Sequence, residues 1–118
     1  MTVLLVCNSR LVGERLTARL SQLAGVTVLG QFRNAEDALQ FIKVELPDIV
    51  IVDAHLVGAT SMILVRMLKS LAAPPVVVAV STSSYQQYYR QSMKEGADFC
   101  FHLPDEFDKL TGLLEGMN

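Results

Sequence analysis

Five short apolar runs alternate with five segments of helical periodicity, and this alternation restricts the fold more than any other feature. The runs cover residues 2–8, 26–32, 48–53, 76–80 and 98–103. Each is nearly continuous in apolar residues, which is typical of a strand buried on both faces of a parallel sheet. Parallel strands need crossover connections, usually helices, so the intervening segments are predicted to cover the sheet.

The segments between the runs carry apolar residues at the three- and four-residue spacing of amphipathic helices. They cover residues 9–25, 35–46, 59–73, 85–96 and 105–116. Gly25 is expected to end the first helix, Asn34 to cap the second and Pro47 to end it. The second helix is expected to present an apolar stripe formed by Ala35, Ala38, Leu39, Ile42 and Leu46.

The alternation predicts a single α/β domain over residues 1–118, a flavodoxin-like, doubly wound, five-stranded parallel sheet with strand order 2-1-3-4-5 and five helices. Sheets of this kind bind ligands beyond the carboxyl ends of their strands, where the strand order reverses. The first apolar run ends at Cys7 and Asn8, and the third ends at Asp53. A site is therefore expected where these residues meet.

Composition excludes several classes of protein. The formal net charge is -2 and no cluster of Lys or Arg is present, so nucleic-acid binding by this domain is not expected. No apolar run approaches the roughly 18 residues that span a bilayer, and no basic stretch precedes the first run, so a cytoplasmic protein without membrane contact is predicted. Cys7 and Cys100 lack a C-x-x-C spacing and are expected to be free and buried.

The segment from Asp53 to Gly58 fits the pattern D-x-H-x-x-G, in which His55 would face the cobalt of a cobalamin cofactor. In cobalamin-binding domains this pattern follows the first strand, and a glycine pair makes room for the cofactor. Here it follows the third run and no Gly-Gly pair exists. A flavodoxin-like domain that binds flavin or cobalamin remains the alternative from a different class. No phosphate-binding glycine loop or Ser-His-Asp arrangement is evident, so the chain is not expected to be an enzyme.

The whole chain resembles the receiver domains of response regulators in bacterial two-component, phosphorelay signalling. The resemblance lies in "VLLVCNSRLVGERL", "PDIVIVDAHLVG", "VVVAVST" and "KEGADFCFHLP". In that family an acidic pair after the first strand holds Mg²⁺, and an aspartate after the third strand accepts a phosphoryl group. A Ser or Thr ends the fourth strand, and a lysine precedes a proline after the fifth.

Three positions match this pattern. Asp53 stands at the phosphoacceptor position, Ser81 at the hydroxyl position that contacts phosphate, and Pro104 at the proline position. Other interpretations remain open for two of them. Asp53 is alternatively a solvated acid that caps the next loop, and Ser81 a hydroxyl of the "STSS" turn.

Four positions depart from the pattern. Cys7 and Asn8 replace the acidic pair, and Leu103 replaces the lysine. Cys100 stands where many receivers carry a Tyr or Phe. Phosphoryl transfer gathers negative charge that a metal and a cation must neutralise, so impaired Mg²⁺-dependent phosphorylation is expected. No cofactor is expected, with Mg²⁺ bound only if the site keeps residual activity. The alternative is a working phosphoacceptor receiver that uses Asp53.

Three tyrosines lie within one and a half turns of the fourth helical segment. Tyr85, Tyr88 and Tyr89 cannot all face the sheet, so one or two are expected to be exposed. Together with Cys100 and Phe101 they are predicted to form a surface for a protein partner, because Tyr is enriched at interfaces. The resemblance implies a histidine kinase, an output domain or a second copy of the chain as that partner.

Overall fold

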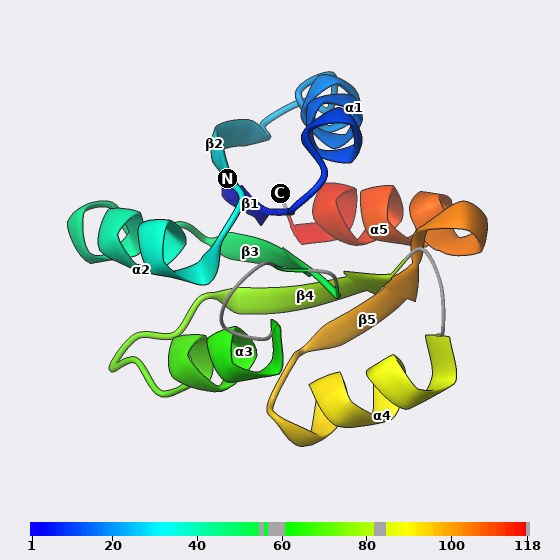
Figure 1. The fold of residues 1–118 in the computed structure, drawn as a ribbon. Helices are drawn as coiled ribbons and strands as arrows, with labels where there is room; N and C mark the ends of the chain where they lie inside the picture. The colour runs from blue at the N-terminus through cyan, green and yellow to red at the C-terminus, as the bar shows by residue number, and fades with distance from the viewer. Residues whose placement is uncertain (55, 57–60, 82–84, 118) are drawn as a thin grey trace.

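The five apolar runs form the strands of a single parallel sheet in the computed structural model, which describes residues 1–54, 56, 61–81 and 85–117. The strands are β1 (Thr2–Val6), β2 (Thr27–Phe32), β3 (Ile49–Asp53), β4 (Val76–Ser81) and β5 (Phe99–His102). They lie in the order β2-β1-β3-β4-β5 (Figure 1). This confirms the predicted topology.

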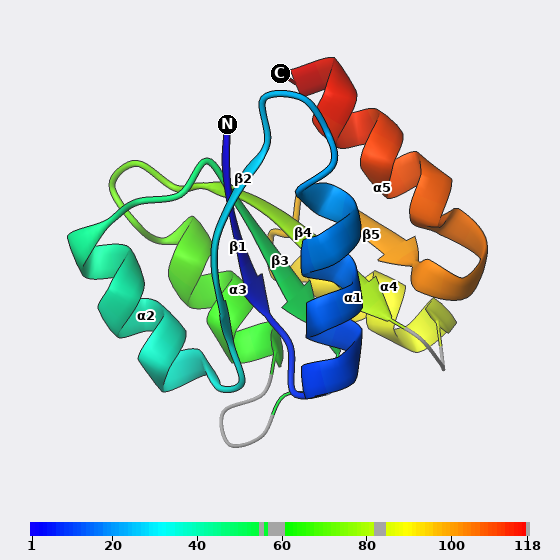
Figure 2. The same cartoon turned by 90° about the horizontal axis from the view of Figure 1, so that it is seen from above.

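Five helices cover both faces of the sheet. They are α1 (Arg10–Leu20), α2 (Ala35–Val44), α3 (Ser61–Lys69), α4 (Tyr85–Lys94) and α5 (Leu103–Met117). α1 and α5 cover one face, and α2, α3 and α4 cover the other (Figures 1 and 2). In the described part of the chain no helix is both long and apolar enough to cross a membrane.

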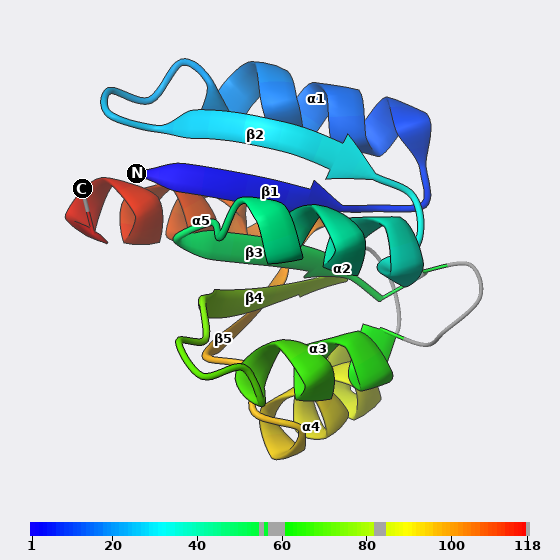
Figure 3. The same ribbon diagram turned by 90° about the vertical axis from the view of Figure 1, so that its left-hand side faces the viewer.

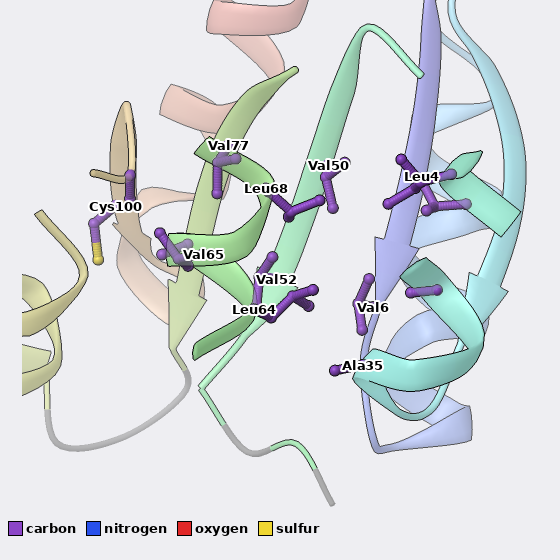
Figure 4. Close-up of a cluster of buried hydrophobic side chains, with 14 of the residues drawn as sticks. Leu4, Val6, Ala35, Val50, Val52, Leu64, Val65, Leu68, Val77 and Cys100 are labelled. Carbon is purple, nitrogen blue, oxygen red and sulfur yellow. The ribbon is translucent and has the colours of Figure 1, made fainter. Parts of the chain in front are cut away.

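The core consists of two layers because successive side chains of a strand point to opposite faces. On the α2–α3–α4 side, Leu4 and Val52 lie in one cluster of buried side chains (Figure 4). On the α1–α5 side, Leu5 and Ile51 lie in the other, together with Leu110 of α5. All five side chains are at most 1% exposed. Strands buried on both faces explain why their sequences are continuously apolar.

Two helices end earlier than the sequence predicted. α1 ends at Leu20, and Gly25, with φ 77°, lies in the turn that leads to β2, so the predicted end at Gly25 is wrong. α2 begins at the predicted cap, where Asn34 Oδ1 accepts a hydrogen bond from the Asp37 N–H at 2.9 Å. It ends at Val44, and Leu46 is 50% exposed, so Leu46 is not part of the buried stripe.

The fifth helix begins earlier than predicted, at Leu103 and ahead of Pro104. The backbone leaves helical geometry at Glu106, with φ -118° and ψ 18°, and then continues as helix to Met117. Glu106 Oε1 accepts a hydrogen bond from the backbone N–H of His102 at 2.9 Å. This contact satisfies a strand-end donor and allows the helix to begin directly after β5.

Candidate functional site

The carboxyl ends of β1 and β3 bring a thiol and a carboxylate together. The register pairs Val6 with Val52, so the next residue of each strand, Cys7 and Asp53, meet at the same edge of the sheet. Cys7 Sγ donates a hydrogen bond to Asp53 Oδ2 at 3.2 Å. Both residues are buried, with 3% and 7% of their surface exposed. The predicted juxtaposition of the two strand ends is therefore present as a direct contact.

The thiol of this pair is held in its protonated form. Burial, the hydrogen bond to Asp53 and the negative charge of that carboxylate together raise the pKa of Cys7 to about 12. A thiolate is the form that attacks electrophiles and binds metals, so at neutral pH Cys7 is a weak nucleophile and a poor metal ligand. Its chemical role at this edge is that of a neutral hydrogen-bond donor.

Asn8 lies next to this pair at the same edge of the sheet. Its backbone carbonyl accepts a hydrogen bond from Arg33 Nε at 3.3 Å, and Arg33 follows β2 directly. Arg33 was not among the predicted site residues, although its place directly after a parallel strand puts it at this edge. Ser9, the next residue, caps α1 by accepting a hydrogen bond from the Val12 N–H at 3.3 Å. Within the described residues no three His, Cys, Asp or Glu side chains gather as metal ligands.

Ser81 and Leu103 lie in different surroundings. Ser81 ends β4 one residue beyond Val80, the register partner of Asp53, and is 1% exposed. Leu103 instead lines an apolar groove of about 440 Å³ between α1 and α5, together with Pro104. Leu103, the residue predicted to replace the lysine, thus contributes an apolar side chain between two helices. His55 lies outside the described residues.

The structure corrects two members of the predicted partner surface. Tyr88 is only 9% exposed, and its hydroxyl donates to the Val52 backbone carbonyl at 3.3 Å. Cys100 is 6% exposed and belongs to the cluster on the α2–α3–α4 side of the sheet (Figure 4). Tyr88 lies on the side of α4 that faces the sheet, and Cys100 points from β5 toward the α4 side of the sheet. Burial raises the pKa of both groups.

Of the predicted members, Tyr89 and Phe101 remain. With Met93 of α4 and Phe99 of β5, which the prediction did not include, they define what we call the α4–β5 face. Tyr89 and Met93 lie one helical turn apart on α4 and are 41% and 37% exposed. On β5, Phe101 packs against the cluster on the α1–α5 side of the sheet, opposite α4, and its ring stacks against that of Phe99, which is 38% exposed, with centroids 6.2 Å apart. Tyr85 begins α4, and its side chain lies outside the described part of the chain.

Comparisons with known proteins agree on one family. The model of the response regulator receiver domain matches residues 3–115. A response regulatory protein of Shewanella oneidensis is 32% identical over 85 residues, which cover 72% of this chain and 36% of that protein. The sensory transduction protein LytT of Enterococcus faecalis is 27% identical over 115 residues, 98% of this chain and 47% of that protein. The chain therefore spans less than half the length of these relatives.

A solved structure supports the fold. The signal receiver domain of the response regulator NarL from Mycobacterium tuberculosis superposes with a TM-score of 0.87 at 21% identity, covering 98% of this chain and 94% of that chain. The matches give no sign of a flavin- or cobalamin-binding fold. With 113 consecutive positions matched by the family model, from residue 3 to residue 115, the chain belongs to the response regulator receiver domain family.

Proposed function

We propose that this receiver domain signals through protein–protein contact and that Asp53 is a poor phosphoacceptor. The observation that carries the proposal is the hydrogen bond from the neutral Cys7 thiol to the Asp53 carboxylate. Transfer of a phosphoryl group to a carboxylate builds negative charge that metal ions and fixed cations neutralise. Cys7 and Asn8 bring no negative charge to attract a metal, and Leu103 brings no cation.

The same contact helps to satisfy the buried Asp53 carboxylate. A buried charge is costly unless hydrogen bonds satisfy it, and the thiol donates one such bond to Oδ2. In an intact receiver site clustered acids repel one another and require a metal. Here a neutral donor, the Cys7 thiol, lies against the Asp53 carboxylate.

Phosphorylation of the isolated domain tests the proposal. With acetyl phosphate or phosphoramidate and excess Mg²⁺, we expect intact-mass spectrometry to show Asp53 largely unmodified, because the electrostatic contributions that dominate such transfers, each worth several kcal/mol, are missing. The variant combining Cys7→Asp, Asn8→Asp and Leu103→Lys is expected to gain a phosphate. A stable phosphate on the unmodified protein that Asp53→Asn abolishes would favour the working phosphoacceptor instead.

The α4–β5 face is the proposed contact surface for a protein partner. Tyrosine is among the residues that form interface hot spots, which cost about 2 kcal/mol or more when truncated, and Met is enriched at interfaces. We therefore expect the double substitution Tyr89→Ala and Met93→Ala to weaken partner binding at least tenfold, with little loss of stability because both side chains are more than one third exposed.

Pull-down with a candidate histidine kinase or output domain, followed by calorimetry, measures this effect. Leu11→Ala on α1 is the matched control, because Leu11 is 57% exposed on the other side of the sheet. Equal binding by the double variant and the unmodified chain would place the partner surface elsewhere. LytT is named as a sensory transduction protein, and a protein partner of this kind is expected in such a process.

A further inference from the structure

The groove between α1 and α5 has apolar walls and two arginines. The two helices lie side by side on one face of the sheet (Figures 1, 2 and 3), and the groove between them has a volume of about 440 Å³. It is lined by Val12, Arg15, Leu16, Ala18, Arg19, Leu103, Pro104 and Phe107. A hollow of this size, with mostly apolar walls and a few polar groups, is typical of sites that bind small molecules.

Arg19 is held at this groove by a contact between the two helices. Its guanidinium carbon lies 4.1 Å from the centroid of the Phe107 ring, which is a cation–π contact. The aliphatic part of an arginine side chain packs on apolar surface while its charged end stays accessible. A guanidinium carries several N–H donors, so the contact with one ring leaves donors that an acceptor in the groove can use.

No acidic residue of the groove balances the two arginines. Arg15 and Arg19 lie four residues apart on α1, and like charges at this spacing repel each other. All the residues that line the groove are otherwise uncharged. In the part of the chain that the structure describes, neither guanidinium forms a salt bridge. An anion in the groove would therefore relieve a repulsion that the protein itself leaves in place.

The acidic residues that flank the lining residues in the sequence have other partners or lie outside the groove. The pairs are Arg10–Glu14 at 2.9 Å, His102–Asp105 at 3.0 Å and Lys109–Glu106 at 3.0 Å. Asp108 is exposed and is not among the lining residues. The charge that faces the groove is therefore positive, although α5 as a whole carries more acidic than basic residues.

We propose that this groove, which we call the α1–α5 groove, binds a small amphiphilic carboxylate, that is, one carboxylate attached to an apolar chain or ring. The carboxylate would lie between Arg15 and Arg19, whose planar guanidinium groups match its geometry. The apolar part would lie against Leu16, Leu103 and Phe107. The groove includes neither the phosphoacceptor position nor the α4–β5 face, so the proposal is independent of the proposed function.

Titration of the whole chain with octanoate, followed by amide NMR and calorimetry, tests the proposal. We expect saturable binding, with the largest shift changes at amides of residues 12–19 and 103–107. Octanamide has nearly the same shape without the charge, and octylammonium has the opposite charge. Both are expected to bind at least ~10-fold more weakly, because charge-assisted hydrogen bonds to arginine are the stronger ones. Acetate, which lacks the apolar part, is expected to show no saturable binding.

Three variants test the residues. Arg15→Gln with Arg19→Gln is expected to weaken octanoate binding at least ~10-fold and to abolish the preference over octanamide. Arg10→Gln with Lys109→Gln is the matched control, because it removes the same charge from the same two helices at positions outside the groove. It is expected to leave the dissociation constant unchanged. Ala18→Phe fills the groove from an exposed position and is expected to block binding. Circular dichroism establishes that all three variants fold.

Several results would overturn the proposal. Octanoate that shows no saturable binding below its critical micelle concentration would exclude the site, even if the protein bound vesicles of phosphatidylglycerol. Equal affinity for octanoate and octanamide would exclude recognition of the carboxylate. An equal loss of affinity in the control variant would show that net charge acts at long range and that the two arginines have no special role. Shift changes centred on the groove between α2 and α3, which Leu39 and Met67 line, would place the ligand elsewhere.

Discussion

Substitution of Tyr88 by alanine is expected to lower the free energy of unfolding by about 3 kcal/mol, within the range seen when large buried aromatic side chains are truncated. Tyr88 is 9% exposed and packs in the cluster that α4 shares with α3 and β3. Its hydroxyl also donates to the Val52 carbonyl, one residue before Asp53. The substitution would leave a cavity and remove a hydrogen bond at the same place.

Chemical denaturation of three variants separates these contributions. Tyr88→Phe keeps the ring and loses only the hydroxyl, so it is expected to cost about 1 kcal/mol. Tyr89→Ala, on the adjacent but exposed position, is expected to cost less than about 1 kcal/mol. If Tyr88→Ala proved no more destabilising than Tyr89→Ala, Tyr88 would not be the residue that fixes α4 against the sheet.

Magnesium binding is expected to appear only when the acidic pair is rebuilt. The unmodified protein should show no saturable Mg²⁺ binding at millimolar concentration. A hydrated Mg²⁺ ion at this site would meet the carboxylate of Asp53 and the protonated thiol of Cys7, which is a poor ligand for a hard ion. Cys7→Asp with Asn8→Asp places two carboxylates beside Asp53 and should create binding at sub-millimolar concentration. Isothermal calorimetry and amide NMR measure both.

A neutral control isolates the effect of charge. Cys7→Ser with Asn8→Ser changes the same two positions without adding a carboxylate, so it is expected to bind no more Mg²⁺ than the unmodified chain. Saturable sub-millimolar binding by the unmodified chain would refute the prediction. That result would also weaken the case for a poor phosphoacceptor.

The fold could be predicted from the sequence because its strands are buried on both faces. A run such as Ile49–Asp53, apolar until the aspartate that ends it, is typical of a central strand, and five such runs separated by helices leave few topologies. Helix ends were predicted less accurately because a glycine such as Gly25 suits a turn as well as a helix end. Leu46 fitted the helical spacing, but the helix had already ended at Val44.

The site was predicted only in part. Parallel strands end at one edge, which placed Cys7 and Asp53 together, but a hydrogen bond between them depends on side-chain rotamers that the sequence does not reveal. Tyr88 and Tyr89 are adjacent in the sequence, so only the rotation of α4 relative to the sheet decides which one is buried. Leu103 was predicted to end the fifth strand but begins α5 instead. The contact from the His102 N–H to Glu106 that accompanies this helix start is likewise a side-chain feature that the sequence does not reveal.

The hydrogen bond from the Cys7 thiol to Asp53 bears on which cellular inputs can alter the state of this carboxylate. Where a carboxylate is balanced by a metal ion and a phosphoryl group, its state varies with kinase activity and with the supply of ions. Here the balancing hydrogen is covalently attached to Cys7 and stays there at neutral pH, because the pKa of the thiol is about 12. It follows from the proposed function that the domain would present its partner surface without a phosphorylation step.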